Sequence, residues 1–300
     1  MISVVTPVFN EEKSLTELYQ RIKATLGGKK WEIIFVNDGS TDNSEKIIKE
    51  LTEKDPNIKL ISFRINQGKS QALMAGFAGT KGEIIVTIDA DLQDQPEEIE
   101  KLLAKLNEGY DLVSGWKRKR NDPWPNVVFS QFFNLILRKL TKVNLHDVNC
   151  GFKIYRREVI GKLNLYGDLY RFIPVLAAKS GFKVTEIEVT HGSRRFGKSK
   201  YKFTKFFFGS FDLLTVLFLI NFKNKPLQFF GTIGSLLFGS GTLISLYLTF
   251  LRLRGQSIGR RPLLILGILL IIVGIQLFTF GFLAELIVNQ EKREERSQKQ

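Results

Sequence analysis

Short apolar runs alternate with amphipathic stretches over about the first 115 residues of the chain. Between the first two runs, leucine and isoleucine recur at helical spacing from Leu15 to Leu26, which predicts a helix that Asn10 is placed to cap. Pro96 marks the expected first turn of the helix after the fourth run. The strand candidates are residues 2–6, 31–36, 58–63, 83–88 and 111–115. Such alternation predicts an α/β fold with a parallel, doubly wound sheet.

Polar residues collect directly after the strand candidates, at residues 6–12, 37–42, 64–72 and 89–95. Because the carboxyl ends of parallel strands form a ligand crevice, we expect these segments to offer acceptors for a base and a ribose, plus a metal site for phosphates. Two familiar phosphate motifs do not fit. No GxGxxG follows the first strand candidate, and Gly68-Lys69-Ser70 lacks the earlier glycine of a P-loop because Phe63 stands there.

The fourth run ends in carboxylates, in the sequence EIIVTIDADLQDQP. In strand geometry Asp89 and Asp91 share a face while Ala90 points away, and Asp94 follows shortly after. Two aligned carboxylates suit a hard cation, and Mg²⁺ or Mn²⁺ usually bridges protein carboxylates to a diphosphate. A solvated acidic turn is the alternative that this segment alone leaves open.

Two runs near the C-terminus, residues 227–251 and 263–284, contain no charged residue. Each exceeds the ~20 residues that a membrane-spanning helix needs, so we predict two transmembrane helices rather than a buried core hairpin. The preceding residues 206–222 form a shorter apolar stretch, interrupted by Asp212 and flanked by lysines. This pattern is typical of an interfacial helix against anionic lipid headgroups.

These segments predict an α/β domain over residues 1–205, an interfacial amphipathic region over 206–225, a two-helix anchor over 226–288 and a charged tail over 289–300. Two spans return the chain to its starting side, so the large domain and the tail should face one compartment. The arginines between the spans balance the charges on the other side, and the positive-inside rule therefore does not decide the orientation.

Glycine recurs every seven residues in both runs, at Gly234 and Gly241 and again at Gly267, Gly274 and Gly281. Seven residues are nearly two helical turns, so each set forms a stripe of small residues. Small residues allow close helix approach in lipid, and we predict that the spans pack against each other, or against a neighbouring protomer, through these stripes. The alternative is that glycine is simply common in membrane helices.

The 300-residue chain has a net charge of +14 and one cysteine, Cys150. It carries no recognition-helix or RNA-binding motif, so we expect no nucleic-acid partner; an acidic lipid or a phosphorylated substrate fits the charge better. A single cysteine excludes an internal disulfide and fits a reducing compartment. Because the chain begins directly with a strand candidate, no cleavable signal peptide is expected.

Five ordered motifs resemble a known family: PVFNE (7–11), VNDGSTD (36–42), NQGKSQA (66–72), DADLQDQP (89–96) and SRRFGKSKY (193–201). With them the chain resembles the family 2 glycosyltransferases, and within these the polyprenyl-phosphate glycosyltransferases such as dolichyl-phosphate mannose synthases and bacterial undecaprenyl-phosphate glucosyltransferases. The resemblance covers the whole chain. It implies a GT-A domain, which is Rossmann-like with a mostly parallel sheet, followed by interfacial helices and two transmembrane helices.

On the donor side, the resemblance implies a nucleotide pocket lined by Pro7, Phe9, Asn10 and Glu11. Asp38 would accept a hydrogen bond from the base, and Lys69 would lie near the ribose or the phosphates. Purely structural roles are the alternative: Asn10 would then serve as a helix cap and Phe9 as part of the apolar packing, without contact to a nucleotide.

The resemblance also implies a metal and diphosphate motif made of Asp89, Asp91 and Gln93. A later R-x-x-G-x-S-K pattern would close over the diphosphate; its members are Arg194, Gly197, Ser199 and Lys200. Arg194 would be the charge-assisted donor there and, with Asp89 and Asp91, a catalytic residue. Ser199 and Lys200 would help to bind the nucleotide sugar. The alternative for Lys200 is contact with lipid headgroups alone.

The acceptor side departs from the family pattern. Lys117 stands at a basic position where arginine is commoner, and Asn126 stands where a basic residue near the acceptor phosphate is expected. Arg118 or Arg120 could compensate, and Ser130 keeps a polar position on the following helix. We therefore expect Lys117, Arg118 and Ser130 to contact the acceptor phosphate.

The activity implied by the resemblance is transfer of one hexose from UDP-glucose or GDP-mannose to polyprenyl phosphate, at the cytoplasmic membrane face, with Mg²⁺ or Mn²⁺. The product would serve cell-envelope, protein or lipid glycosylation, and a homo-oligomer is not excluded. The second pKa of a phosphate monoester is ~6, so the attacking oxygen is already anionic and needs little help from a base. The departing diphosphate needs positive charge. A single displacement inverts the anomeric carbon.

Other activities are weighed against this one. A processive polysaccharide synthase would carry a Q-x-x-R-W motif and more spans, and the sequence has neither. A non-catalytic nucleotide-binding membrane scaffold fits poorly, because the carboxylates of the motifs and Arg194 are all retained. Direct glycosylation of a hydroxyl on a membrane lipid or lipid-linked saccharide would need a general base, for which Asp147 is the candidate.

Overall fold

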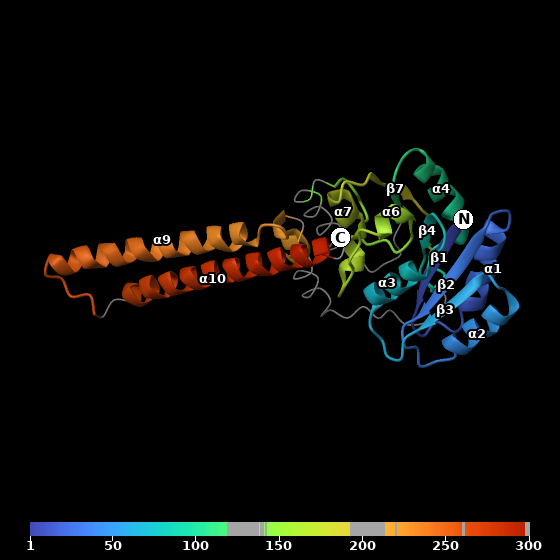
Figure 1. Ribbon diagram of the computed structural model, residues 1–300, viewed down its shortest axis with the longest axis horizontal. Helices are drawn as coiled ribbons and strands as arrows, with labels where there is room; N and C mark the ends of the chain where they lie inside the picture. Colours follow the sequence, from blue (N-terminus) through green and yellow to red (C-terminus); the bar gives the residue numbers. More distant parts are fainter. Residues whose placement is uncertain are drawn as a thin grey trace. The chain divides into compact units, whose positions relative to one another are not determined.

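A computed structural model of the chain describes residues 1–118, 138, 141, 143–192, 214–219, 221–259 and 262–297 (Figure 1). The chain separates into two compact units, Met1–Val216 and Leu217–Gln300.

The first unit is built on a seven-stranded sheet with the order β3-β2-β1-β4-β6-β5-β7. The strands are β1 (Ile2–Val8), β2 (Trp31–Asn37), β3 (Ile58–Ser62), β4 (Ile84–Thr87), β5 (Leu112–Trp116), β6 (Lys153–Arg156) and β7 (Val184–Glu188). Neighbours among β1 to β4 are parallel, β6 runs antiparallel between β4 and β5, and β7 is parallel to β5. The mostly parallel sheet and its first five strands are confirmed. The short strands β6 and β7 were not predicted.

Helices cover both faces of this sheet (Figure 1). One face carries α1 (Leu15–Leu26), α2 (Ser44–Lys54) and α4 (Ile99–Asn107), whose apolar residues join one core with β1 and β2. The other face carries α3 (Lys69–Gly79) and α7 (Ile173–Lys179). The result is the helix–sheet–helix layering that the alternating pattern predicts.

The helix α3 lies directly on β1 because Gly76 has no side chain. A Cβ built on Gly76 would be 2.3 Å from Cγ1 of Val5, closer than real atoms approach. The described part of the unit also contains three short elements: η1 (Pro96–Glu98), α6 (Arg157–Ile160) and η2 (Leu169–Phe172). Pro96 therefore opens a 3₁₀ turn that leads into α4, close to its expected place.

The prediction that Asn10 caps α1 is wrong. The N-cap residue of α1 is Ser14, and Asn10 lies earlier with a φ of 57°, a left-handed conformation that asparagine tolerates better than most residues. Its side-chain Oδ1 accepts a hydrogen bond from the backbone N–H of Thr41 at 2.8 Å. Asn10 therefore joins two loops instead of ending a helix.

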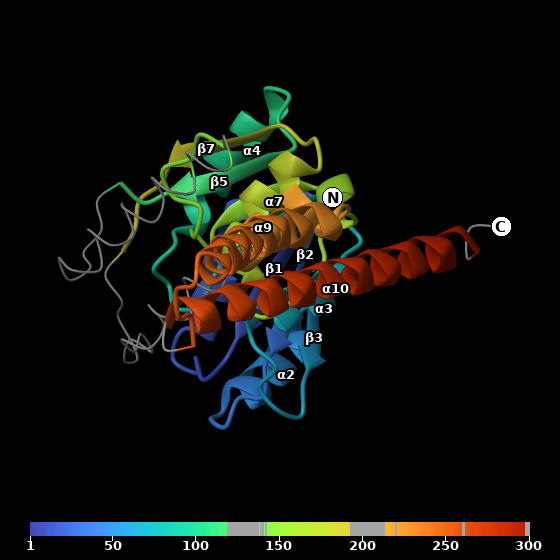
Figure 2. The same cartoon turned by 90° about the vertical axis from the view of Figure 1, so that its left-hand side faces the viewer.

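The second unit contains two long helices, α9 (Pro226–Leu253) and α10 (Pro262–Ser297), which run side by side (Figures 1 and 2). Their most apolar windows are only 17% and 11% buried, so neither helix is the core of a soluble fold. At ~1.5 Å per residue, each is long enough to cross the ~30 Å hydrocarbon layer. Residues 214–219 and 221–222 are helical. The rest of the predicted interfacial helix, with Asp212, lies outside the described residues.

The glycine stripes of α9 and α10 face each other. A Cβ on Gly234 would lie 2.8 Å from the carbonyl oxygen of Gly274, and one on Gly241 would lie 2.6 Å from that of Gly267. Real Cβ atoms do not approach this closely, so the two backbones can meet only because these positions lack side chains. The prediction that the spans pack against each other through the stripes is confirmed.

Replacing Gly274 with leucine should lower the thermal stability of the detergent-solubilised protein. A Cβ there meets the oxygen of Gly234 at 2.8 Å, and overpacking of this kind typically costs about 1–3 kcal/mol or more. Ile275→Leu is the matched control, because Ile275 is 52% exposed on the neighbouring position. Ile271 is unsuitable as a control because it lies against Gly241. Equal unfolding temperatures for both variants would contradict a packing role for the stripe.

Candidate active site

The loops that follow β1 and β2 are fastened to each other at the carboxyl edge of the sheet. Besides the contact from Asn10 to Thr41, the backbone N–H of Asn10 donates to Oγ of Ser40 at 3.0 Å. The N–H of Glu12 donates to Oδ2 of Asp42 at 3.1 Å. This clasp holds the PVFNE segment, whose predicted pocket residues are at least partly exposed: Pro7, Phe9, Asn10 and Glu11.

Asp38 is buried beneath the same edge and holds the loop that leads into α3. Its Oδ1 accepts a hydrogen bond from the N–H of Gln67 at 2.7 Å, and its Oδ2 accepts one from that of Gly68 at 3.0 Å. The next residue, Gly39, has a φ of +67°, and a Cβ there would lie 2.5 Å from the backbone nitrogen of Asn66. Asp38 thus shapes the loop; that it also accepts a hydrogen bond from a base stays a prediction.

Lys69, the first residue of α3, pairs with one of the predicted metal ligands. Its Nζ lies 2.5 Å from Oδ1 of Asp89 and 5.2 Å from the centre of the Tyr170 ring. Burial alone would lower the pKa of Lys69, but the carboxylate of Asp89 and the other acidic groups nearby raise it above its ordinary value. The sequence did not single out Tyr170, which reaches this place from η2, a hundred residues later in the chain.

Asp89 and Asp91 lie beyond the end of β4 at Thr87, so the expectation that they share a face of a strand is wrong. The chain turns here: Leu92 is buried and has a φ of 60°, a left-handed conformation that leucine rarely adopts. Burying Leu92 leaves the flanking Asp91 and Gln93 partly exposed. The turn, rather than strand alternation, brings the oxygen-bearing side chains to the edge.

The neighbourhood of Asp89 leaves room for its carboxylate. A Cβ on Gly151 would lie 2.5 Å from Oδ2 of Asp89, so a larger residue would displace it. Oδ1 of Asp91 accepts a hydrogen bond from the N–H of Gln93 at 3.2 Å. Among the described residues, no three His, Cys, Asp or Glu side chains already form a metal-binding group.

The third acidic residue of the segment, Asp94, is buried against Lys117. The Nζ of Lys117 lies 2.8 Å from Oδ1 of Asp94, and Nδ1 of His191 lies 3.7 Å from the same oxygen. Burial would raise the pKa of Asp94, but Lys117 and His191 hold it well below its ordinary value. Burial alone would lower the pKa of Lys117, but the carboxylate of Asp94 raises it far above its ordinary value. Both groups are therefore charged.

The other acceptor-side candidates are placed differently or lie outside the described residues. Arg118 is exposed at the rim, 3.5 Å from Glu188. Four predicted site residues lie outside the described ranges: Ser130, Arg194, Ser199 and Lys200. The same holds for three other residues named with these motifs, Gly197, Arg120 and Asn126.

Sequence reasoning missed Lys153, the first residue of β6. Its side chain is buried behind the edge, and Nζ donates a hydrogen bond to the carbonyl oxygen of Cys150. Burial lowers the pKa of Lys153 to about 8. The four residues of β6 are too few to show the alternation of a strand in the sequence. The burial of Lys153 becomes evident only from the position of β6 between β4 and β5. Asp147, the candidate base of the hydroxyl reaction, is also buried.

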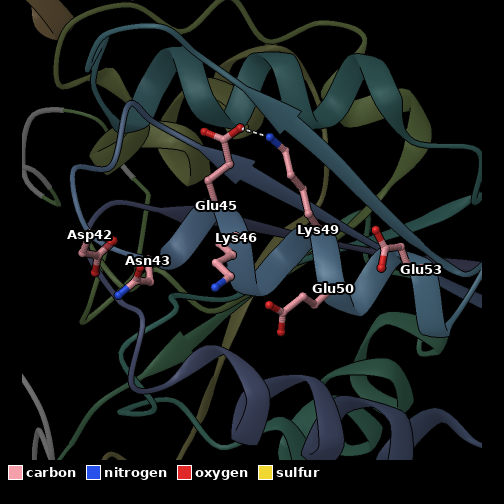
Figure 3. A pocket seen from close by; sticks show the side chains of 7 residues that line it. All are labelled: Asp42, Asn43, Glu45, Lys46, Lys49, Glu50 and Glu53. Atoms are coloured by element: carbon pink, nitrogen blue, oxygen red, sulfur yellow. Dashed lines mark ion pairs between the residues drawn. The ribbon is translucent and has the colours of Figure 1, made fainter.

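A hollow of about 570 Å³ along α2 is not part of this site (Figure 3). Its lining is charged and includes Asp42, Glu45, Lys46, Lys49, Glu50 and Glu53. Glu45 and Lys49 form an ion pair of 2.7 Å one helical turn apart, which is typical of a solvated helix face. None of the predicted site residues lines it.

Comparison with known proteins identifies the family. The family model for glycosyl transferase family 2 matches residues 3–163. The chain is 35% identical to a dodecaprenyl-phosphate galacturonate synthase of Rhizobium johnstonii, over 99% of this chain and 90% of that one. It is 37% identical to an undecaprenyl-phosphate 4-deoxy-4-formamido-L-arabinose transferase of Proteus mirabilis, over 95% and 88%.

The fold also matches solved structures. Glucosyl-3-phosphoglycerate synthase from Mycobacterium tuberculosis superposes with a TM-score of 0.59 at 21% identity, over 73% of this chain and 78% of that one. The sheet, its covering helices and the polar carboxyl edge are those of a GT-A domain. The chain therefore belongs to glycosyl transferase family 2, in the polyprenyl-phosphate branch that its motifs resemble, and it is a glycosyltransferase with the GT-A fold.

Proposed function

We propose that this enzyme transfers one sugar from a nucleotide sugar to polyprenyl phosphate. The observation that carries the proposal is the meeting of two lysine–carboxylate pairs, Lys69 with Asp89 and Lys117 with Asp94, at one edge of the sheet. Each pair is neutral overall, and its ammonium keeps N–H donors for a phosphate group, one on each substrate. The names of the two nearly full-length relatives, both polyprenyl-phosphate sugar transferases or synthases, support the same acceptor.

The donor sugar is part of this proposal. The motifs led us to expect UDP-glucose or GDP-mannose. The relatives are named for galacturonate and for 4-deoxy-4-formamido-L-arabinose, so nucleotide forms of these sugars join the candidates. We propose a nucleotide-activated pyranose, bound with its base near Asp38 and the PVFNE segment.

The residues present fit Mg²⁺ or Mn²⁺. Asp89 and Asp91 offer carboxylate oxygens and Gln93 an amide oxygen, which are the donors that these cations prefer. Asp89 is 32% exposed, and Gly151 leaves its carboxylate space. When bound, the metal would supply positive charge to the departing diphosphate. A related fold has been solved with Mn²⁺ and UDP, which supports the choice.

The proposed reaction needs no strong general base. The acceptor phosphate oxygen is anionic near neutral pH and attacks the anomeric carbon directly, with inversion. Lys117 would hold the acceptor phosphate, and Arg194 would stabilise the charge on the leaving diphosphate. Direct glycosylation of a hydroxyl would need Asp147 as base, and its burial favours the phosphate acceptor instead.

We propose that residues 1–205 catalyse the transfer, 206–225 lie at the interface, 226–288 anchor the protein and 289–300 form a tail. The two apolar helices and the membrane-lipid substrates in the relatives' names indicate a membrane protein. The catalytic part would face the cytoplasm, where nucleotide sugars are made.

The purified protein, incubated with polyprenyl phosphate and a panel of nucleotide sugars, should give a sugar–phosphate lipid detectable by its mass. EDTA should stop the reaction, and Mg²⁺ or Mn²⁺ should restore it. Asp91→Ala should abolish transfer and Asp89→Ala should nearly do so, because both offer oxygens at the diphosphate. Glu50→Ala, on the exposed face of α2, is the control. Full activity in chelator would refute the metal requirement.

Lys69→Met should let Mn²⁺ bind about fivefold or more tightly without nucleotide, while weakening UDP-sugar binding. The ammonium of Lys69 holds Asp89 at 2.5 Å and so competes with a metal for the same carboxylate. Titration of Mn²⁺ by electron paramagnetic resonance measures this directly. Lys49→Met removes an equal charge from an exposed pair on α2 and should change neither affinity. Unchanged Mn²⁺ affinity in Lys69→Met would rule out the competition.

Arg194→Ala should lower turnover by ~10²-fold or more, the loss typical of one transition-state charge stabiliser. Arg195→Ala should have a smaller effect, because it stands outside the R-x-x-G-x-S-K pattern. Steady-state rates of the two variants decide the matter. A reversed order would mean that the register assigned to this segment is wrong by one residue.

A further inference from the structure

Asp94 differs from the two acidic residues before it. Its side chain is 1% exposed, whereas that of Asp89 is 32% exposed at the edge. The groups that face it are themselves largely covered: the side chain of Lys117 is 14% exposed and that of His191 is 9% exposed. Asp94 therefore lies behind the ligand edge, in a position to act on other residues of the site.

Three separate segments meet at Asp94. It belongs to the turn after β4, Lys117 follows the end of β5, and His191 lies beyond β7. The backbones are joined as well, because Asp94 and His191 form a β-bridge and the N–H of Gly192 donates to the carbonyl oxygen of Gln93 at 2.8 Å. The turn that bears the predicted metal ligands is thus tied to the end of β5 and to the segment that leads to Arg194.

The pairing fixes where the charge of Lys117 lies. A lysine on a free surface samples many rotamers, but one whose Nζ is 2.8 Å from a buried carboxylate keeps one position. An ammonium has three donors, so the ion pair leaves Lys117 with donors for a phosphate oxygen. Reaction rates depend on holding the attacking atom within ~3–3.5 Å of its target, so the position of this charge matters for turnover.

We propose that Asp94 is a positioning residue: it holds the Lys117 ammonium toward the acceptor phosphate and sets its distance from the metal-binding turn. The inference rests on the proposed function, because it takes Lys117 as a contact of the acceptor. Asp94 itself touches neither substrate nor metal. Its removal should therefore affect the acceptor and leave the donor nearly unchanged.

The test compares Asp94→Asn, Lys117→Gln and the double variant with the wild-type protein in detergent. Binding of a short, soluble prenyl phosphate in the presence of UDP and Mn²⁺ is measured by calorimetry, and binding of UDP with Mn²⁺ is measured separately. Asp94→Asn should weaken prenyl-phosphate binding about 10-fold or more, the size typical of a lost charge-assisted hydrogen bond, and change UDP–Mn²⁺ binding less than about twofold. The acceptor KM should rise in parallel, with the donor KM unchanged.

The double variant separates positioning from folding. Asp94→Asn alone leaves the Lys117 charge buried without its partner and can destabilise the protein, whereas the double variant removes both charges. If Asp94 acts through Lys117, the double variant binds prenyl phosphate no worse than Lys117→Gln alone. Asp111→Asn, at the other end of β5, is the matched control and should bind both ligands normally.

Each outcome decides between distinct alternatives. Unchanged prenyl-phosphate binding in Asp94→Asn, or additive losses in the double variant, would overturn the positioning role. Loss of UDP–Mn²⁺ binding in Asp94→Asn would also overturn it, because Asp94 would then act on the donor side as well as on the acceptor. If the wild-type protein binds UDP–Mn²⁺ but no prenyl phosphate, the proposed acceptor is wrong, and the positioning role is rejected with it.

Discussion

Paired opposite charges at the carboxyl edge of the sheet are the interaction on which the site depends. Parallel strands deliver their following loops to one place, so lysines and carboxylates from distant segments are forced together there. Lys69 neutralises Asp89 and Lys117 neutralises Asp94, at 2.5 and 2.8 Å. A buried carboxylate without such a partner would be strongly disfavoured, so these pairs permit a dense array of charged groups to persist.

The loops around these charges are held by backbone N–H groups that donate hydrogen bonds to side-chain oxygens. Asp38 accepts from two successive N–H groups before α3, and Asn10 accepts from the loop after β2. Left-handed backbone at Asn10 and Leu92 stores strain of about 1–3 kcal/mol each, which persists only where the surroundings enforce it. The described loops after β1, β2 and β4 are in this way preorganised at the ligand edge.

In the second unit, the contact between α9 and α10 depends on glycine rather than on paired charges. Lipid offers no hydrophobic drive for two apolar helices to associate, so their contact depends on backbone approach at the glycines. Gly234 with Gly274, and Gly241 with Gly267, provide that approach within a single chain.

The sequence alone determined the five principal strands, the two apolar helices, the family and the polar segments that follow the strands, because these depend on local periodicity, long charge-free runs and ordered motifs. Tertiary structure decided the rest. It inserted β6, with Lys153, between β4 and β5, placed Asp89 and Asp91 in a turn, and buried Asp94 against Lys117 and His191. Each of these outcomes depends on contacts between residues far apart in the chain. Neither the period of a strand nor the spacing of a motif carries that information.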